Sequence, residues 1–365
     1  MKKIEFLDLK PSSVFEKRLV SSAKKVIKSG FYILGPEVKN FEDKFSSYVG
    51  TKFSLGVGSG LDAISLSLKS LNLKKDDEVI VPSNTYIATW IAVSKLGAKI
   101  VPVEPNIFSY NIEAKEIEKK INKKTKAIII VHLYGMPVDF KPIQKLCKKN
   151  GIYLIEDAAQ GHGAVKDGVK VGNMSDFGAF SFYPTKNLGA LGDAGAISLN
   201  NKNFYKKISS LRNYGSQKKY YNNFIGENSR LDEIQASFLS IKLNWLDKEI
   251  KKRRNLASRY FSNLSDIDKV ILPQKKINES SWHLFTIRVR NRNKFMNYLD
   301  DNNIGHIIHY PIPPHLQKSY RHLGFKKGDY PIAEKIHKEI ISIPLRPSLR
   351  LNEIDYISEK IRNFK

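Results

Sequence analysis

The sequence has little of what would place a protein in a membrane or in an oxidising compartment. It contains one cysteine, Cys147, which has no partner for a disulfide within the chain. No run of about 18 or more apolar residues occurs, so we expect no segment to span a bilayer. The first residues, Met1 to Glu5, are charged and lack the apolar stretch of a signal peptide. We therefore expect a cytoplasmic protein.

Acidic residues are also scarce, since 36 Asp and Glu stand against 61 Lys and Arg, a formal net charge of +25. Such an excess can indicate nucleic-acid binding. Here the lysine pairs are spread along the chain, and the densest basic cluster, Lys251 to Arg254, continues a helical pattern. Because no zinc-finger or helix-turn-helix spacing occurs, we expect no nucleic-acid partner, no membrane partner and no metal site. The charge favours an anionic small substrate, such as a nucleotide-linked sugar, or reflects a lysine-rich composition.

The chain shows no internal repeat and no low-complexity linker. Helical patterns, such as 61–71 and 87–96, separate several short apolar runs. This alternation indicates an α/β fold with a mainly parallel sheet covered by helices on both faces. The predicted strands are 53–57, 78–81, 99–104, 127–132, 151–157, 177–182 and 196–199.

The length of 365 residues predicts a large domain and a smaller one. Apolar residues at helical spacing predict a long helix from Arg230 to Lys252 that continues past Leu264 and links the two. We place the boundary after residue 250, with a large domain at 1–250 and a small domain at 251–365. The small domain is expected to hold a strand at 282–289, a proline-rich loop and a C-terminal helix.

Lys186 lies in a string, 181–196, that sets it apart from an ordinary surface lysine. Two aromatic residues precede it, and glycines at 189, 192 and 195 allow sharp turns and a close approach to a ligand. Isolated lysines are usually solvated charges. A lysine beside buried aromatic rings and tight turns would have a lowered pKa. It could then act as an amine nucleophile or form a Schiff base.

Three further elements lie at predicted strand ends. The turn 58–60 precedes a helix, and its backbone N–H groups would make an anion site, although such turns are common. Asp157 ends a strand, on the face opposite Glu156, and would need a cationic partner such as a protonated pyridine nitrogen, unless it caps a helix. Tyr86 would lie flat against a cofactor or pack in the core. With Lys186, these elements are what pyridoxal 5′-phosphate requires.

Five ordered motifs resemble those of the DegT/StrS family of sugar aminotransferases, which are fold-type I pyridoxal-phosphate enzymes. The resemblance runs over nearly the whole chain. It implies the fold-type I aminotransferase architecture, with a mainly parallel seven-stranded sheet flanked by helices and a smaller C-terminal α/β domain. The motifs lie at 31–35, 58–63, 156–160, 181–196 and 228–233.

The resemblance also implies roles for individual residues. Lys186 would form the Schiff base and move the proton, and Asp157 would keep the pyridine nitrogen protonated. Asn228 would reach the cofactor of the neighbouring subunit, which implies a homodimer with shared active sites. The other cofactor contacts would be Ser59, Gly60 and Ser181 at the phosphate, Gln160 at the ring hydroxyl and Tyr86 on the ring face.

The implied reaction is a ping-pong transamination from L-glutamate to a nucleotide-linked keto-sugar. The segments 211–216 and 308–315 resemble the branch that aminates 3-keto-6-deoxyhexoses on dTDP, in pathways to lipopolysaccharide or S-layer glycans. Thr185 departs from this branch, where glycine is expected, and could alter the turn beside Lys186. The substrate contacts would be Tyr183, Lys219, Tyr221, His309, Tyr310 and His315, unless the histidines simply bond to backbone.

Other functions stay open at this point. A UDP-linked 3-keto sugar acid is the nearest competing acceptor, and it would call for an added cation near the sugar. A 4-keto-6-deoxy sugar is the next. A different class is a basic DNA-binding regulatory protein on a relict aminotransferase fold.

Overall fold

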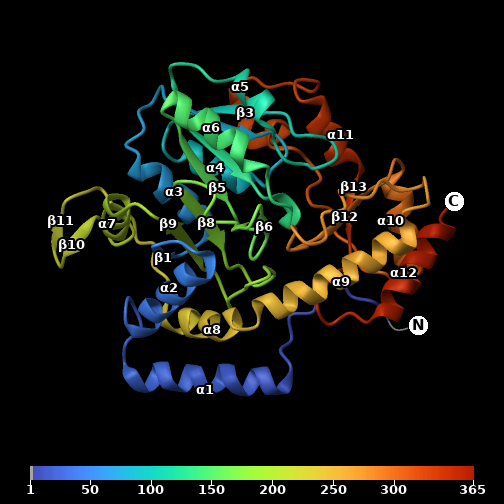
Figure 1. Cartoon of the computed structure of the whole chain (residues 1–365), viewed down its shortest axis with the longest axis horizontal. Helices are drawn as coiled ribbons and strands as arrows, with labels where there is room; N and C mark the ends of the chain where they lie inside the picture. The colour runs from blue at the N-terminus through green and yellow to red at the C-terminus, as the bar shows by residue number, and fades with distance from the viewer. Residues whose placement is uncertain (1–2) are drawn as a thin grey trace.

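The computed structural model describes residues 3–365. A seven-stranded sheet forms its centre, in the order β1-β9-β8-β5-β4-β2-β3 (Figure 1). Only β9 runs against the others, because it pairs antiparallel with both β1 and β8. The mainly parallel α/β fold predicted from the sequence is thus confirmed. The strands are β1 (Phe53–Val57), β2 (Glu78–Pro82), β3 (Lys99–Val103), β4 (Thr125–Val131), β5 (Tyr153–Asp157), β8 (Phe177–Ser181) and β9 (Gly195–Leu199).

The strands of this sheet read as near-continuous apolar runs because both faces are buried. In β4, Ile128 and Ile130 pack on one face and Ile129 on the other, and all three are fully buried. One face is covered by α2 (Pro36–Val49), α6 (Phe140–Asn150) and α8 (Glu233–Leu243). The opposite face is covered by α3 (Gly60–Ser70), α4 (Ile87–Ser94) and α7 (Lys202–Leu211).

The single long helix predicted from Arg230 onwards is wrong, because the chain turns between α8 and α9 (Leu246–Leu264). The Trp245 N–H donates to the Lys242 carbonyl, a three-residue bond that tightens the end of α8. The turn contains Asn244, and asparagine favours helix ends over helix interiors. As predicted, α9 links two cores, since Ile250 packs beneath the sheet and Tyr260 packs with the C-terminal elements.

The C-terminal elements gather at one end of the molecule (Figure 1). There β12 (Phe285–Arg288) pairs antiparallel with β13 (Ile340–Ile343), and α9 packs against α12 (Leu351–Asn363). The predicted strand and C-terminal helix are confirmed. The domain boundary after residue 250 lies inside α9 and stays a prediction. The remaining elements here are α10 (Arg292–Asp301), η2 (Pro314–Leu316), η3 (Lys318–Leu323) and α11 (Pro331–Glu339).

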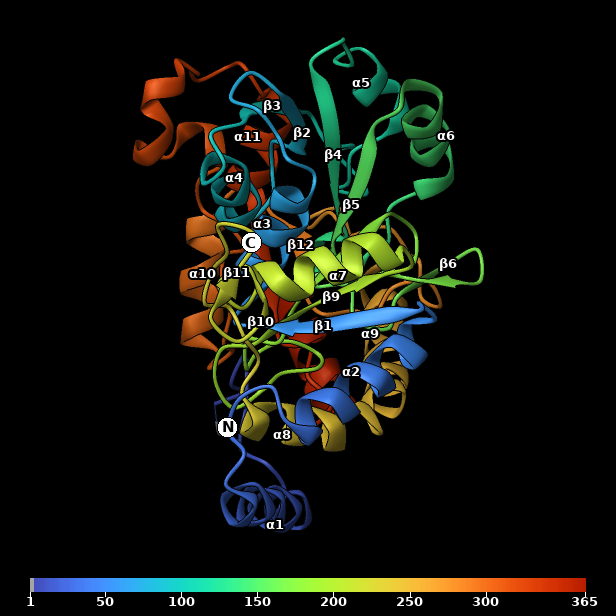
Figure 2. The same ribbon diagram turned by 90° about the vertical axis from the view of Figure 1, so that its left-hand side faces the viewer.

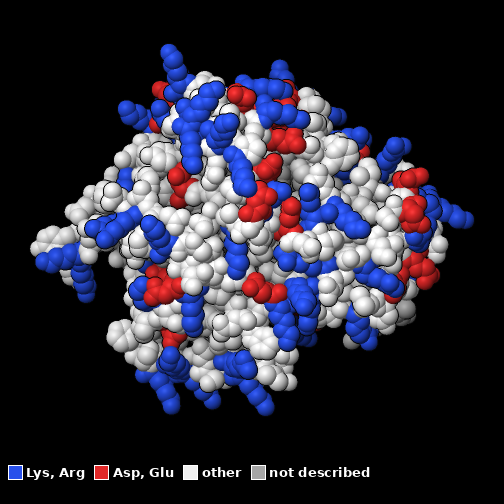
Figure 3. Space-filling model, in the orientation of Figure 1, with Lys and Arg blue, Asp and Glu red and all other residues white. Residues whose placement is uncertain are grey.

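Two elements stand out from the body. Helix α1 (Ser13–Ser29) lies beyond α8 at the edge of the molecule (Figure 2), and the hairpin of β10 (Ser216–Lys218) and β11 (Tyr221–Asn222) projects beside α7. Lys and Arg are scattered over the face seen in Figure 3. Within residues 3–365, no helix has both the length and the apolar character needed to cross a membrane. The other short elements are α5 (Ala114–Glu118), η1 (Leu133–Gly135), β6 (Val165–Lys166) and β7 (Val169–Lys170).

Candidate active site

The carboxylate of Asp157 marks the centre of the site, at the carboxyl end of β5. It is almost fully buried, and its Oδ2 accepts a hydrogen bond of 2.7 Å from the hydroxyl of Thr89 on α4. Its Oδ1 accepts from the Ala159 N–H at 3.2 Å. Burial raises the pKa of Asp157, whereas the Thr89 hydroxyl, the Ala159 N–H and the charge of Lys186 lower it. Asp157 and Lys186 are thus near enough for the charge of each to act on the other.

Lys186 lies on a tight turn that follows β8. Its N–H donates to the Tyr183 carbonyl at 2.8 Å, with Thr185 inside the turn. Gly189 lies so close to the Pro184 carbonyl that any side chain at position 189 would collide with this carbonyl. Burial lowers the pKa of the Lys186 amine to about 8, and Asp157 counteracts part of this effect. This direction is the one that the sequence predicts for Lys186.

The start of α3 and the end of β8 meet beside this turn. The Ser59 hydroxyl caps α3 by accepting from the Asp62 N–H at 3.1 Å. A Cβ added to Gly60 would lie 2.6 Å from Cβ of Ser181, so only glycine fits this close approach. The first N–H groups of a helix have no partner within it and favour an anion. The predicted anion-binding residues thus converge in one place.

Aromatic and amide groups close another side of the site. Tyr86 precedes α4, and its half-exposed ring lies 5.0 Å from the ring of Tyr310. Gln160 donates from Nε2 to the Tyr310 hydroxyl at 3.0 Å, and its Oε1 accepts from the Tyr134 N–H at 2.6 Å. His309 contacts Ser342 Oγ through Nδ1 at 2.8 Å. Burial, and to a lesser degree the Lys186 charge, lowers the pKa of His309 to about 4, so its ring is neutral at pH 7.

The other predicted residues are less closely assembled. Tyr183 lies exposed on the Lys186 turn, two residues from Ser181. The hairpin carries Lys219 at its tip and Tyr221 on β11, and Asn228 is exposed. His315 is buried and meets Glu334 at 3.0 Å. Four predicted site residues share no hydrogen bond with any other predicted site residue within the described residues 3–365: Lys219, Tyr221, Asn228 and His315.

Residues 14–362 match the model of the DegT/DnrJ/EryC1/StrS aminotransferase family. The chain belongs to this family. It is 46% identical over 363 residues to the dTDP-3-amino-3,6-dideoxy-α-D-galactopyranose transaminase of Aneurinibacillus thermoaerophilus, with 99% of each chain covered. The solved structure of S. venezuelae DesV in complex with a ketimine intermediate superposes with a TM-score of 0.95, at 40% identity over 99% of each chain. The NtdA structure from Bacillus subtilis with bound cofactor PMP gives 0.93 at 30% identity, covering all of this chain and 85% of that one.

The residues of this aminotransferase fit pyridoxal phosphate. A buried carboxylate needs a compensating cation, and Asp157 receives its two hydrogen bonds from neutral groups, with Lys186 as a nearby positive charge. A protonated ring nitrogen would supply the compensation. Because Gly60 has no side chain, the helix start lies close to Ser181, and the first N–H groups of the helix would hold a phosphate beside the Ser181 hydroxyl. In the described part of the chain, no cluster of three or more His, Cys, Asp or Glu side chains could hold a metal ion.

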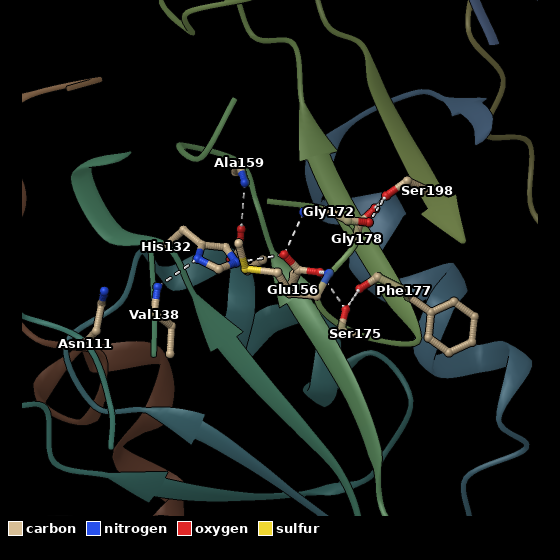
Figure 4. Close-up of polar contacts among 12 residues, drawn as sticks. Asn111, His132, Val138, Glu156, Ala159, Gly172, Ser175, Phe177, Gly178 and Ser198 are labelled. Atoms are coloured by element: carbon tan, nitrogen blue, oxygen red, sulfur yellow. Dashed lines mark hydrogen bonds and ion pairs between the residues drawn. The ribbon is translucent and has the colours of Figure 1, made fainter. Parts of the chain in front are cut away.

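Strand alternation places Glu156 on the side of β5 opposite Asp157, and Glu156 meets His132 there (Figure 4). His132 Nδ1 accepts from the Val138 N–H at 3.1 Å, so its Nε2 carries the proton and donates to Glu156. The fully buried carboxylate of Glu156 thus links the turn after β4 to the segment before β8. It accepts from the Gly172 N–H at 2.6 Å, the Met174 N–H at 2.8 Å, the Ser175 hydroxyl at 2.8 Å and His132 at 3.0 Å.

Sequence reasoning missed two residues that contact the aminotransferase site, Thr89 and Tyr134. Thr89 follows Tyr86 by three residues at the start of a predicted helix, a spacing that places both on one side of that helix. That spacing was an available signal. Tyr134 follows a predicted strand end, but its contact with Gln160 joins positions 26 residues apart, which no local pattern reveals.

Proposed function

We propose that this aminotransferase uses pyridoxal phosphate to transfer an amino group from L-glutamate to a dTDP-linked 3-keto-6-deoxyhexose. The observation that carries the substrate is the full-length relative at 46% identity, a dTDP-3-amino-3,6-dideoxygalactose transaminase. The chemistry is supported by the Lys186 amine, the Asp157 carboxylate and the anion site, which follow the carboxyl ends of β8, β5 and β1 in one sheet.

Each residue has a task in this proposal. Pyridoxal phosphate, when bound, supplies an electron sink next to the substrate carbon that exchanges its proton. With a pKa of about 8, Lys186 is neutral in roughly a tenth of molecules at pH 7 and can accept and return that proton at Nζ. Asp157 holds a proton on the ring nitrogen through its carboxylate. Ser59, Gly60 and Ser181 hold the phosphate, and Tyr86 covers the ring.

We also propose that the enzyme is a homodimer whose subunits share active sites. The exposed Asn228 and the projecting hairpin make no hydrogen bond to the other predicted site residues, within residues 3–365. Tyr220 and Ile225 beside them are 84% and 91% exposed, which is costly for apolar surface unless it is covered. Lys219, Tyr221 and Asn228 would then serve the partner's site. The cytoplasmic location and the fate of the product in a lipopolysaccharide or S-layer glycan stay predictions.

The regulatory alternative is not favoured. Lys186 and Asp157 are both present, and the relatives at 46% and 41% identity are named as transaminases, although two others, at 42% and 39%, carry sensory or regulatory names. The competing acceptors remain to be tested directly. A UDP-linked 3-keto sugar acid and a 4-keto-6-deoxy sugar differ from the proposed acceptor in charge or in the position of the carbonyl group.

The test is product formation, followed by mass spectrometry, with L-glutamate and each of the three acceptors at equal concentration. We expect the dTDP-3-amino sugar to form with a kcat/KM at least about tenfold higher than either competitor gives. Lys186→Ala should form no product, and Asp157→Asn should bind the cofactor poorly or hold it inactive. A higher kcat/KM with the sugar acid would contradict the proposed acceptor. Wild-type turnover by Lys186→Ala would contradict the proposed mechanism.

A further inference from the structure

Tyr134 touches two separate parts of the site through its two polar groups. It lies in the turn η1 after β4, with a left-handed backbone at φ 60°, and its ring packs edge-on against Tyr110 at 5.7 Å. Its backbone N–H donates to Gln160 Oε1 at 2.6 Å, and its hydroxyl donates to the His309 carbonyl. A tyrosine in a left-handed conformation persists only where surrounding contacts determine it.

The first contact fixes the direction of the hydrogen bonds that follow it. Because Gln160 Oε1 meets an N–H, its NH₂ group faces the Tyr310 hydroxyl. One N–H of that group serves Tyr310, which leaves the second for the ring oxygen of a cofactor. The Tyr310 oxygen acts as acceptor, so its own proton is available to a ligand beside Tyr86.

The second contact holds the loop 308–315. This segment carries His309 and Tyr310, two of the predicted acceptor contacts. The loop is held at His309 from two sides, by the Tyr134 hydroxyl at its carbonyl and by Ser342 at its ring. The loop position therefore depends on where Tyr134 stands.

The turn that carries Tyr134 is itself firmly held. Asn111 Oδ1 accepts from the Leu133 N–H at 3.3 Å, and Asn111 Nδ2 donates to the Met136 carbonyl at 3.0 Å. The Gly135 carbonyl accepts from the Ser281 N–H at 3.0 Å. At the start of the turn, the buried Glu156 fixes the His132 ring (Figure 4).

We propose that Tyr134 is a positioning residue that fixes the cofactor-side Gln160 and the acceptor loop 308–315 relative to each other. Its backbone N–H serves both half-reactions through Gln160, whereas its hydroxyl serves the half-reaction with the keto-sugar. This division of roles rests on the proposed function. The inference goes beyond that function because it assigns a role to a residue that need not touch cofactor or substrate.

The test is Tyr134→Phe, which keeps the ring and the backbone N–H and removes only the hydroxyl. We expect KM for dTDP-3-keto-6-deoxygalactose to rise about threefold to tenfold, the range for one lost hydrogen bond, while the half-reaction with L-glutamate stays within about twofold. In the cofactor-free protein, backbone amides of 308–315 should exchange with deuterium faster than in the wild type. Tyr110→Phe, which removes the hydroxyl of the neighbouring buried ring, is the matched control and should change neither quantity.

Equal slowing of both half-reactions, or unchanged KM and unchanged deuterium exchange, would overturn the role of Tyr134. A wild-type enzyme that fails with the keto-sugar would instead overturn the proposed function. In that case the exchange measurement still decides the inference, because it needs neither cofactor nor substrate: faster exchange in Tyr134→Phe alone supports it, and unchanged exchange refutes it.

Discussion

At the scale of single residues, burial and a neighbouring carboxylate have opposite effects on the pKa of Lys186. Burial disfavours the ammonium form, and Asp157 partly restores it. Asp157 is balanced in the same way, since burial favours its neutral form while Thr89, Ala159 and Lys186 favour the carboxylate. Burial therefore moves both groups toward their neutral forms, and the charge of each partly offsets that shift in the other.

The lowered pKa of Lys186 predicts how the cofactor-free protein takes up pyridoxal phosphate. Only the neutral amine attacks the aldehyde, so the rate should rise about tenfold per pH unit below pH 8 and level off above it. Stopped-flow absorbance from pH 6 to 10 measures this rate. A rate that keeps rising to the ordinary lysine pKa of 10.5 would show that the site does not lower the pKa of Lys186.

The hydroxyl of Thr89 lowers the pKa of Asp157 by donating a hydrogen bond to its carboxylate. Thr89→Val keeps the shape but removes the hydroxyl that lowers the pKa of Asp157, so that pKa should rise. Because activity requires the carboxylate, the acid limb of the kcat profile should move to higher pH. Cofactor affinity should fall about tenfold, as expected for one hydrogen bond to a charged group.

Thr89→Ser, which retains a hydroxyl, serves as the control and should restore both properties of the wild type. If the valine variant kept the acid limb and the cofactor Kd of the wild type, Thr89 would have no role in setting Asp157.

At the scale of elements, two motifs that are nearly 200 residues apart form one joint. Glu233, the first residue of α8, accepts hydrogen bonds at the start of α2 from the N–H groups of Gly35 at 2.7 Å, Glu37 at 2.8 Å and Val38 at 2.9 Å. In return, the Glu233 N–H donates to the Tyr32 carbonyl. A carboxylate at a helix N-terminus satisfies unpaired donors and opposes the helix dipole.

Removing this cap should lower stability while leaving the chemistry intact. Glu233→Ala should cost about 2 kcal/mol in free energy of unfolding, and Glu233→Gln less, because one acceptor oxygen remains. Urea unfolding measures both. Glu116→Ala, which removes an exposed pair with Lys119, should stay within about 0.5 kcal/mol. A Glu233→Ala variant as stable as the wild type would contradict the capping role.

The elements also show how far sequence reasoning reaches. The seven strands of the large sheet were predicted because buried strands are apolar on both faces, and β4 with its three consecutive isoleucines is the clearest example. The break between α8 and α9 was missed because Leu243, Leu246 and Ile250 keep helical spacing across it. A hydrophobic period does not record a local turn at Asn244 and Trp245.

The site was predictable where its residues occupy strand ends or glycine turns, as Lys186, Asp157 and Gly60 do. Thr89 and Tyr134 depend on contacts between distant segments, which the sequence does not display. The contact of His315 with Glu334 is part-buried and could not be read from composition, and the role of His315 at the substrate stays a prediction.

At the scale of the whole molecule, shared active sites predict complementation between two inactive variants. We expect Lys186→Ala to be inactive and Asn228→Ala to lose most activity. If Asn228 serves the partner's site, a mixed dimer holds one site with both changes and one with neither. A random mixture of the co-expressed variants should then recover about a quarter of wild-type activity, because half the dimers are mixed.

The control for complementation is Lys186→Ala combined with Asp157→Asn. Both residues belong to the same subunit's site, so every site in the mixed dimer carries one change and activity should stay lost. Absence of recovery in the Lys186 and Asn228 mixture would show that each subunit works alone.

The measurement that tests the central claim most directly is the absorbance spectrum of the protein with pyridoxal phosphate through one full cycle. We predict that L-glutamate removes the visible band of the bound cofactor and that dTDP-3-keto-6-deoxygalactose restores it. Loss of the band without recovery would contradict the assigned sugar. A protein that shows no visible band with pyridoxal phosphate would contradict the account of Lys186 and Asp157 altogether.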